Sequence, residues 1–192
     1  MNAQLAGLCQ SFTEALEDTV PTISPGSPYL RVAEEILEMA FAYLEDGIVF
    51  YKRDDHVNAL AAWSYGFGWL EAGADLGILV VPPSFSLIPE MYGSIPSDSG
   101  EHLEEKTLRY RRMLNEACLS IEDAPDVSSP LSQVCRSFQD TIHDWKMKGE
   151  SYHARQDLES ALASYSYAYG WLDCGVRAGI FRVAGDRHLF TA

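Results

Sequence analysis

Basic residues are scarce in this chain of 192 residues, which contains 14 lysines and arginines against 28 acidic side chains. The shortage is greatest in residues 1–95, where 3 basic residues stand against 13 acidic ones. A formal net charge of −14 repels nucleic-acid phosphates and anionic membrane surfaces, so we expect neither as a partner. A basic partner protein remains compatible with this charge.

Other signatures are absent as well. The four cysteines form no CxxC pair, and each falls within an apolar helical pattern, which predicts small buried thiols in a reducing cytoplasm. No apolar run is long enough to span a bilayer. The sequence also lacks HExxH, a glycine-rich phosphate loop and a nucleophile elbow, so we assign no catalytic residue and no cofactor.

An internal duplication is the strongest feature that the sequence does contain. Residues 27–79 align without a gap on residues 129–181, about 102 positions later, and about a third of the aligned positions are identical. Shared runs include Ala-Leu-Ala, which begins at Ala59 and Ala161, and Gly-Trp-Leu, which begins at Gly68 and Gly170. We conclude that the chain contains two copies of one unit.

Each copy has the apolar periodicity of packed helices. Apolar residues recur every three or four positions over 29–50 and again over 131–152, which predicts one helix in each copy. Ser27 and Ser129 each precede a proline, a pairing that favours a helix N-terminus.

A second helix follows in each copy after a tight break. We expect it to be capped by Asp55 and Asp157 and to run to about Leu79 and Phe181. Small residues recur about once per turn along one side of it, at Ala61, Ser64, Gly68 and Ala72 and their counterparts Ala163, Ser166, Gly170 and Cys174. Because small residues let helix backbones approach closely, we predict that the two copies pack through Gly68 and Gly170.

A further apolar helix precedes each pair, and Asp98 and Glu101 are spaced like a capping box before the second one. The predicted fold class is therefore all-α, with two tandem three-helix up-and-down bundles packed as a pseudo-dimer. We place the first unit at 1–80, a Pro-rich linker at 81–100 and the second unit at 101–192. The linker is expected to pack against the bundles because it contains five large apolar side chains, Phe85, Leu87, Ile88, Met91 and Tyr92.

The repeated segment resembles an archaeal family known as domain of unknown function 357. The resemblance lies in Asp55, Tyr65 and the run Gly68-Trp69-Leu70-Glu71, and it recurs around Gly170-Trp171-Leu172-Asp173. The second copy keeps the family's Gly-Trp-Leu-Asp, whereas the first has Glu71 in place of the aspartate. The resemblance implies small three-helix up-and-down bundles with no assigned activity and no catalytic residues.

The same segments also share the spacing of a tetratricopeptide helix pair, from Tyr43 to Gly66 and from Trp145 to Ala168. The period of about 102 is far from the 34 or so of that repeat. We interpret the similarity as the packing pattern of any helical hairpin, which favours binding over catalysis.

Aromatic residues alternate along the second helix of each copy, so their rings cannot all face one core. Some of them fill the core and the contact between the copies, or they form an aromatic binding surface. Glu71 and Asp173 are the acidic pair that recurs beside them. The binding candidates are Tyr65, Trp69, Glu71, Tyr167, Trp171 and Asp173.

Three other constellations have simpler explanations. Asp140, His143 and Asp144 share a helical face but lack further ligands, so we predict no metal site. The pairs Arg136 with His143 and Arg182 with His188 resemble a spacing found in helical ribonucleases, but neither is repeated in the other copy. The basic cluster of Lys106, Arg109, Arg111 and Arg112 is interleaved with glutamates, which favours a salt-bridged surface over a phosphate site.

The sequence therefore favours a non-enzymatic helical interaction or scaffold protein with a protein partner, and a homo-oligomer is compatible with it. The alternative is a small-molecule-binding or enzymatic bundle with a site where the copies meet. A polar, partly enclosed cavity at Tyr65, Glu71, Tyr167 or Asp173 would favour the alternative. A dry, filled junction would favour the interaction protein.

Overall fold

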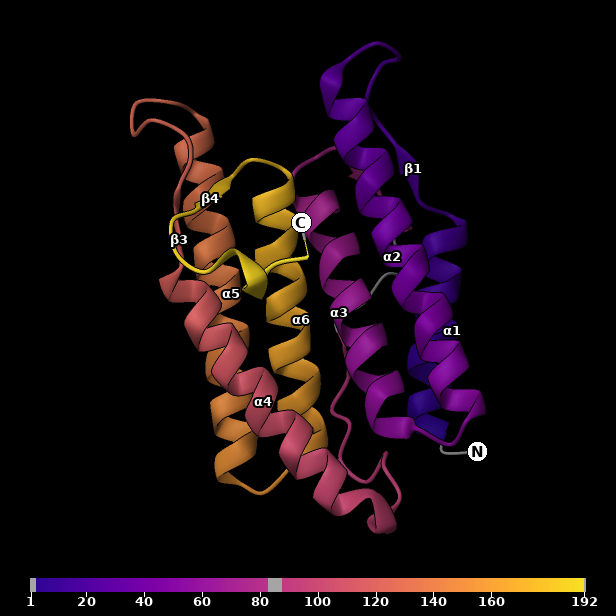
Figure 1. Ribbon diagram of the computed structural model, residues 1–192. Coiled ribbons are helices and arrows are strands. Elements are labelled where there is room, and N and C mark those ends of the chain that lie inside the picture. The colour runs from indigo at the N-terminus through magenta and orange to yellow at the C-terminus, as the bar shows by residue number, and fades with distance from the viewer. Residues whose placement is uncertain (1–2, 83–87, 192) are drawn as a thin grey trace.

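The computed structural model describes residues 3–82 and 88–191, and within them the two copies repeat one order of elements (Figure 1). The first copy comprises α1 (Ala3–Glu17), β1 (Val20–Pro21), α2 (Pro28–Lys52), α3 (His56–Asp75) and β2 (Leu79–Val80). The second comprises α4 (Gly100–Leu119), β3 (Ile121–Asp123), α5 (Leu131–Ala154), α6 (Leu158–Arg177) and β4 (Phe181–Val183). The all-α fold class and the two-copy organisation are confirmed. Among the described residues, no helix combines the length and apolarity needed to cross a membrane.

Three of the four long helices begin directly after the predicted capping residues. The fourth, α5, begins one position later than predicted, at Leu131, with Pro130 as its N-cap, although the Ser129 hydroxyl still accepts the Leu131 N–H at 3.2 Å. The Ser27 hydroxyl accepts the backbone N–H two residues later at 3.3 Å. Asp55 and Asp157 each accept the N–H three residues later through Oδ1, at 3.1 and 3.0 Å. The tight break before each of them contains one residue in the left-handed region, Asp54 at φ 61° and Gln156 at φ 63°. Both copies therefore make the same turn between their two long helices.

The prediction that α3 and α6 reach Leu79 and Phe181 is wrong. Both helices end earlier, because Gly77 and Gly179 adopt positive φ values of 70° and 72° and turn the chain out of the helix. The residues that follow form short strands instead. β2 pairs antiparallel with β1, and β4 pairs antiparallel with β3, so each strand pair ties the end of its unit back to the segment after its first helix.

The copies meet along α3 and α6, which lie side by side in the middle of the molecule (Figure 1). Their backbones touch at Gly68 and Gly170, as the small-residue stripe predicts. A Cβ atom on Gly68 would lie 2.3 Å from the carbonyl oxygen of Tyr167, and one on Gly170 would lie 2.2 Å from that of Tyr65. No side chain fits between the helices there. This close approach compensates for the helix-weakening effect of an internal glycine.

The first helices of the two copies pack differently. α1 contacts both α2 and α3, and its apolar face, which includes Leu5, Leu8 and Phe12, is fully buried. α4 is five residues longer than α1 at 20 against 15 residues, and it packs mainly on α6. Figure 1 shows α4 running obliquely across α6, so the duplication is less exact here than in the two long helices.

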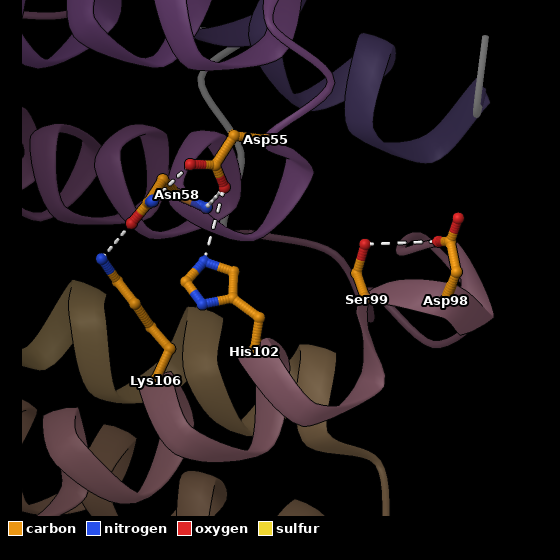
Figure 2. Close-up of polar contacts among 6 residues, drawn as sticks. All are labelled: Asp55, Asn58, Asp98, Ser99, His102 and Lys106. Carbon is orange, nitrogen blue, oxygen red and sulfur yellow. Dashed lines mark hydrogen bonds and ion pairs between the residues drawn. The ribbon is translucent and has the colours of Figure 1, made fainter.

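The N-terminal part of α4 also contacts the first copy through a polar cluster (Figure 2). His102 Nε2 lies 3.5 Å from Asp55 Oδ1, and Lys106 donates to the side-chain oxygen of Asn58. Asn58 in turn donates to Asp55 Oδ2 at 2.5 Å. The residue that caps α3 therefore also helps to connect the two copies.

The capping box expected at Asp98 and Glu101 is not formed. Residues Ser97–Ser99 make a short 3-10 turn, and α4 begins at Gly100 without a side-chain cap. Ser99 donates to Asp98 at 3.4 Å, so these two side chains bond to each other (Figure 2). The continuous turn from the 3-10 segment into α4 leaves no separate N-cap position for Asp98.

Part of the linker packs against the second copy, as expected. Ile88 and Met91 are buried, and the Met91 N–H donates to the Ser160 hydroxyl at 2.8 Å. Tyr92 is 69% exposed, which contradicts its predicted packing role. Phe85 and Leu87 lie outside the described residues.

We predict that Gly68→Ala destabilises the protein by about 3 kcal/mol, because the new methyl group would overlap a backbone carbonyl that cannot rotate away. Urea unfolding of both proteins measures the difference. Gly7→Ala on α1 is the matched control, since nothing lies within 4 Å of its new Cβ and alanine favours the helix by up to about 1 kcal/mol. Equal unfolding midpoints for wild type and Gly68→Ala would contradict this account of the junction.

Candidate functional site

All six binding candidates lie in α3 and α6, at the junction between the copies. The four aromatic candidates are at least 96% buried, which places their rings within the core and the contact between the copies: Tyr65, Trp69, Tyr167 and Trp171. The two carboxylates occupy equivalent positions in the repeat, Glu71 on α3 and Asp173 on α6, yet their surroundings differ. The chemistry of the junction therefore centres on these two acids.

Asp173 is fully buried and is bonded by the C-terminal segment and by α3. The hydroxyl of Tyr65 donates to Asp173 Oδ2. Thr191 donates to the same oxygen through its hydroxyl at 2.8 Å and its backbone N–H at 3.4 Å. The other oxygen, Oδ1, has no partner among the described residues. The C-terminal segment and α3 are thus both hydrogen-bonded to one carboxylate on α6.

Burial raises the pKa of Asp173 to about 6, although the hydrogen bonds from Tyr65 and Thr191 act in the opposite direction. Tyrosines gather around it, and burial followed by the nearby Asp173 charge raises the pKa of Tyr65 well above its usual value. Burial also raises the pKa of Tyr110 to about 12. These phenols remain protonated near neutral pH, where they act as donors.

Glu71 lines a cavity of about 440 Å³, which we call the junction pocket. Burial raises the pKa of Glu71 to about 7, and the neighbouring Trp171 indole offsets part of that shift. Residues of both copies line the pocket: Glu71, Ala74, Asp75, Val81, Thr141, Asp144, Trp145, Lys148 and Trp171. The junction is therefore filled at its glycine contact, and an open hollow with a mixed polar and apolar lining lies on the side of Glu71.

The two sides of the junction are closed to different degrees. Beside Asp173, Arg177 of α6 makes an ion pair with Glu35 of α2 at 2.8 Å. The equivalent positions beside Glu71 are Asp75 and Ser137, where the serine hydroxyl donates to the carboxylate at 3.4 Å. The bidentate ion pair between Arg177 and Glu35 is thus replaced, on the side of the junction pocket, by one long hydrogen bond from Ser137 to Asp75.

The other residue groups that the sequence singled out, the histidine groups and the basic cluster, lie outside the junction. Among the described residues, no group of three His, Cys, Asp or Glu side chains could hold a metal ion. Asp140 and His143 line a groove between α5, the end of α4 and β3. Arg182 lies in β4 and pairs with Glu122 at 2.5 Å. The basic cluster forms a salt-bridged surface, in which Arg109 lies 3.5 Å from Glu105 as the sequence predicts.

One surface was missed by reasoning from the sequence. The outward face of α2 carries an apolar strip between carboxylates, which we call the α2 face: Glu34, Leu37, Glu38, Phe41, Ala42 and Glu45. Phe41 is 43% exposed. The sequence contains a signal for this surface, because these residues recur at helical spacing beside the buried stripe of α2. These residues are not part of the duplicated pattern, since His143 of the second copy stands at the position equivalent to Phe41.

We predict that Asp173→Asn removes part of the pH dependence of stability. The folded-state pKa of about 6 lies above the ordinary 3.8, so the ionised carboxyl destabilises the fold above pH 6, and this cost disappears as the pH falls below 3.8. The shift corresponds to about 3 kcal/mol. Urea unfolding at pH 4 and pH 7.5 should therefore show the asparagine variant gaining about that much relative to wild type at the higher pH.

Tyr65→Phe is a control that should change the stability at pH 7.5 in the opposite direction from Asp173→Asn. It removes a donor to the ionised Asp173, so its loss of stability should be larger at pH 7.5 than at pH 4. A difference between wild type and Asp173→Asn that is the same at both pH values would contradict the assignment.

Comparison with known proteins supports the two-copy organisation of the chain. The family model described as "Protein of unknown function (DUF357)" matches twice, over residues 9–79 and 109–181. No curated protein and no solved structure matches the chain. The two matches confirm the tandem copies inferred from the duplication. The chain belongs to the DUF357 family and contains two copies of its domain.

Proposed function

We propose that the protein is a non-enzymatic helical interaction protein whose α2 face binds a basic amphipathic helix of a partner protein. The observation that supports it is the exposed Phe41 ring on an apolar strip, with carboxylates on both sides. An amphipathic helix would place its apolar residues against Leu37 and Phe41 and its lysines or arginines beside Glu34, Glu38 and Glu45. Aromatic anchors within polar surroundings are typical of protein interfaces.

The charge distribution supports a basic partner. Glu34, Glu38 and Glu45 make no ion pair with another described residue, so their charges are available to a ligand. Residues 1–95 contain ten more acidic than basic side chains, which steers a positively charged segment toward this half of the protein. A second copy of the same chain would bring like charges together, so we propose a different protein as the occupant.

The duplicated residues pack inside the protein, which supports a binding function without catalysis. The repeated glycines and aromatic residues serve the contact between the copies, and the acids at the junction differ between the copies. We further propose a cytoplasmic location, supported by the four cysteines, which are all free thiols. Duplication then provides a rigid scaffold whose outer faces are free to diverge.

The test uses a short helical peptide with leucine every three or four residues and lysine elsewhere. We expect saturable binding to the wild-type protein at about 0.15 M salt, measured by fluorescence anisotropy. Phe41→Ala and Glu38→Lys should each weaken it by about tenfold, through loss of an anchor and reversal of a charge.

Glu104→Lys on α4 is the matched control, since it makes the same charge change on an exposed residue away from α2. It should leave the affinity within about twofold of wild type. Equal weakening by Glu38→Lys and Glu104→Lys would show nonspecific attraction to an acidic protein and overturn the proposal. Binding of the same peptide in scrambled order with equal affinity would do so as well.

A further inference from the structure

The chain segment after β4 crosses in front of α6 toward α3 and covers Asp173 (Figure 1). We call residues 186–191 of this segment the strap. Just before it, the N–H groups of Ala184 and Gly185 donate to the carbonyl oxygen of Ser120, at 2.8 and 3.1 Å. Residues 186–188 are exposed, and Phe190 is buried. The strap therefore begins at a backbone contact with the end of α4 and has one buried side chain near its far end.

Hydrogen bonds to three side chains of the junction hold the far end of the strap. Thr191 donates to Asp173 Oδ2 through its hydroxyl at 2.8 Å and its N–H at 3.4 Å. The hydroxyls of Thr191 and Tyr65 lie 2.8 Å apart, and the hydroxyl of Tyr169 donates to the carbonyl oxygen of Leu189. A segment with so few buried contacts opens locally at a lower free energy than the whole fold.

The strap separates the Asp173 carboxyl group from water. Thr191 is exposed, whereas Asp173, to which it is bonded, has an exposure of 0%. Only Oδ2 of Asp173 is bonded, and Oδ1 has no partner among the described residues. Burying an ionised carboxylate with one unbonded oxygen costs free energy, and an open strap gives that oxygen access to water. Loss of the Asp173 proton therefore favours the open strap.

The first copy shows that the repeat packs without such a bond. Its equivalent acid, Glu71, is only partly buried and lines an open hollow. The residue 102 positions before Thr191 is Pro89, which has neither a hydroxyl nor an N–H to donate. The bond between the strap and the acid is thus specific to the second copy, where it adds to the shared packing of the repeat.

The other titratable groups around Asp173 stay neutral between pH 5 and pH 7.5. Burial raises the pKa of a phenol on each of four helices and of the neighbouring thiol: Tyr43 on α2, Tyr65 on α3, Tyr110 on α4, and Tyr169 and Cys174 on α6. The strap itself carries three exposed ionisable side chains, Asp186, Arg187 and His188. Among the groups packed against the covered carboxyl, Asp173 is therefore the one that changes its charge in this range.

We propose that residues 186–191 are a pH-responsive strap, which opens when Asp173 loses its proton and thereby exposes the carboxylate and the tyrosines around it. The direction follows from the pKa of Asp173, which is about 6 when the strap covers it, against an ordinary value of 3.8 in water. The closed strap keeps its full stability below pH 3.8 and loses it progressively as the pH rises to about 6. This proposal does not depend on the α2 face.

The experiment measures amide hydrogen exchange of the full chain by NMR at pH 5 and pH 7.5. Protection factors relate each measured rate to that of an unstructured peptide at the same pH. We expect the protection factors of the Phe190 and Thr191 N–H groups to fall by about tenfold from pH 5 to pH 7.5. The Ala184 N–H, bonded to Ser120 before the strap begins, is the internal reference and should change by less than about twofold.

Two variants test the role of Asp173. Asp173→Asn removes the ionisable group, so the protection of Phe190 should differ by less than about twofold between the two pH values. Thr191→Val keeps the acid but removes the hydroxyl donor, and should lower the protection of Phe190 by about tenfold at pH 7.5. Circular dichroism confirms that each variant is folded before exchange is measured.

His188→Gln is the matched control, because it removes the histidine of the strap and leaves Asp173 in place. It should retain the tenfold response of the wild-type protein. Equal protection of Phe190 in the wild-type protein at both pH values would overturn the proposal. The same fall in Asp173→Asn, its loss in His188→Gln, or a parallel fall at Ala184 would overturn it as well.

Discussion

The close contact of α3 with α6 is the constraint on which the rest of the structure depends. The backbones can touch only where Gly68 and Gly170 leave no side chain between them. Both helices are consequently buried on nearly every side, which explains the aromatic residues that alternate along them. The contact also brings residues of one copy to residues of the other, so that Tyr65 reaches Asp173 although they are far apart in the sequence.

Burying a polar group in this apolar contact costs free energy unless the group is hydrogen-bonded, and the two copies satisfy their buried carboxyl groups differently. In the second copy the C-terminal segment supplies Thr191 to the buried carboxylate, and an ion pair closes the side of the junction. In the first copy a glutamate, one methylene longer, lies at the edge of a cavity. Duplication followed by this divergence converts a symmetric packing contact into a molecule with one closed side and one accessible side.

The outer surface diverged in the same way. The stripe of α2 that faces α3 has buried counterparts in α5, because both must pack against a central helix. The outward positions are under no such constraint. There the first copy has Phe41 between glutamates, whereas the second has His143 and Met147 among mixed charges. A binding surface that arose after duplication is expected at such positions, where packing does not restrict the residue type.

The sequence by itself determined the helices, the duplication and the glycine contact between the copies. Those features depend on local periodicity and on residues that both copies keep, and the caps at Asp55 and Asp157 belong with them. The early ends of α3 and α6 did have a local signal as well, because Gly77 and Gly179 turn the chain out of each helix. Only the tertiary structure decided the oblique path of α4 and the unequal surroundings of Glu71 and Asp173. The reason is physical: both depend on which distant segment packs beside a residue, such as Thr191 beside Asp173, and no local pattern contains that information.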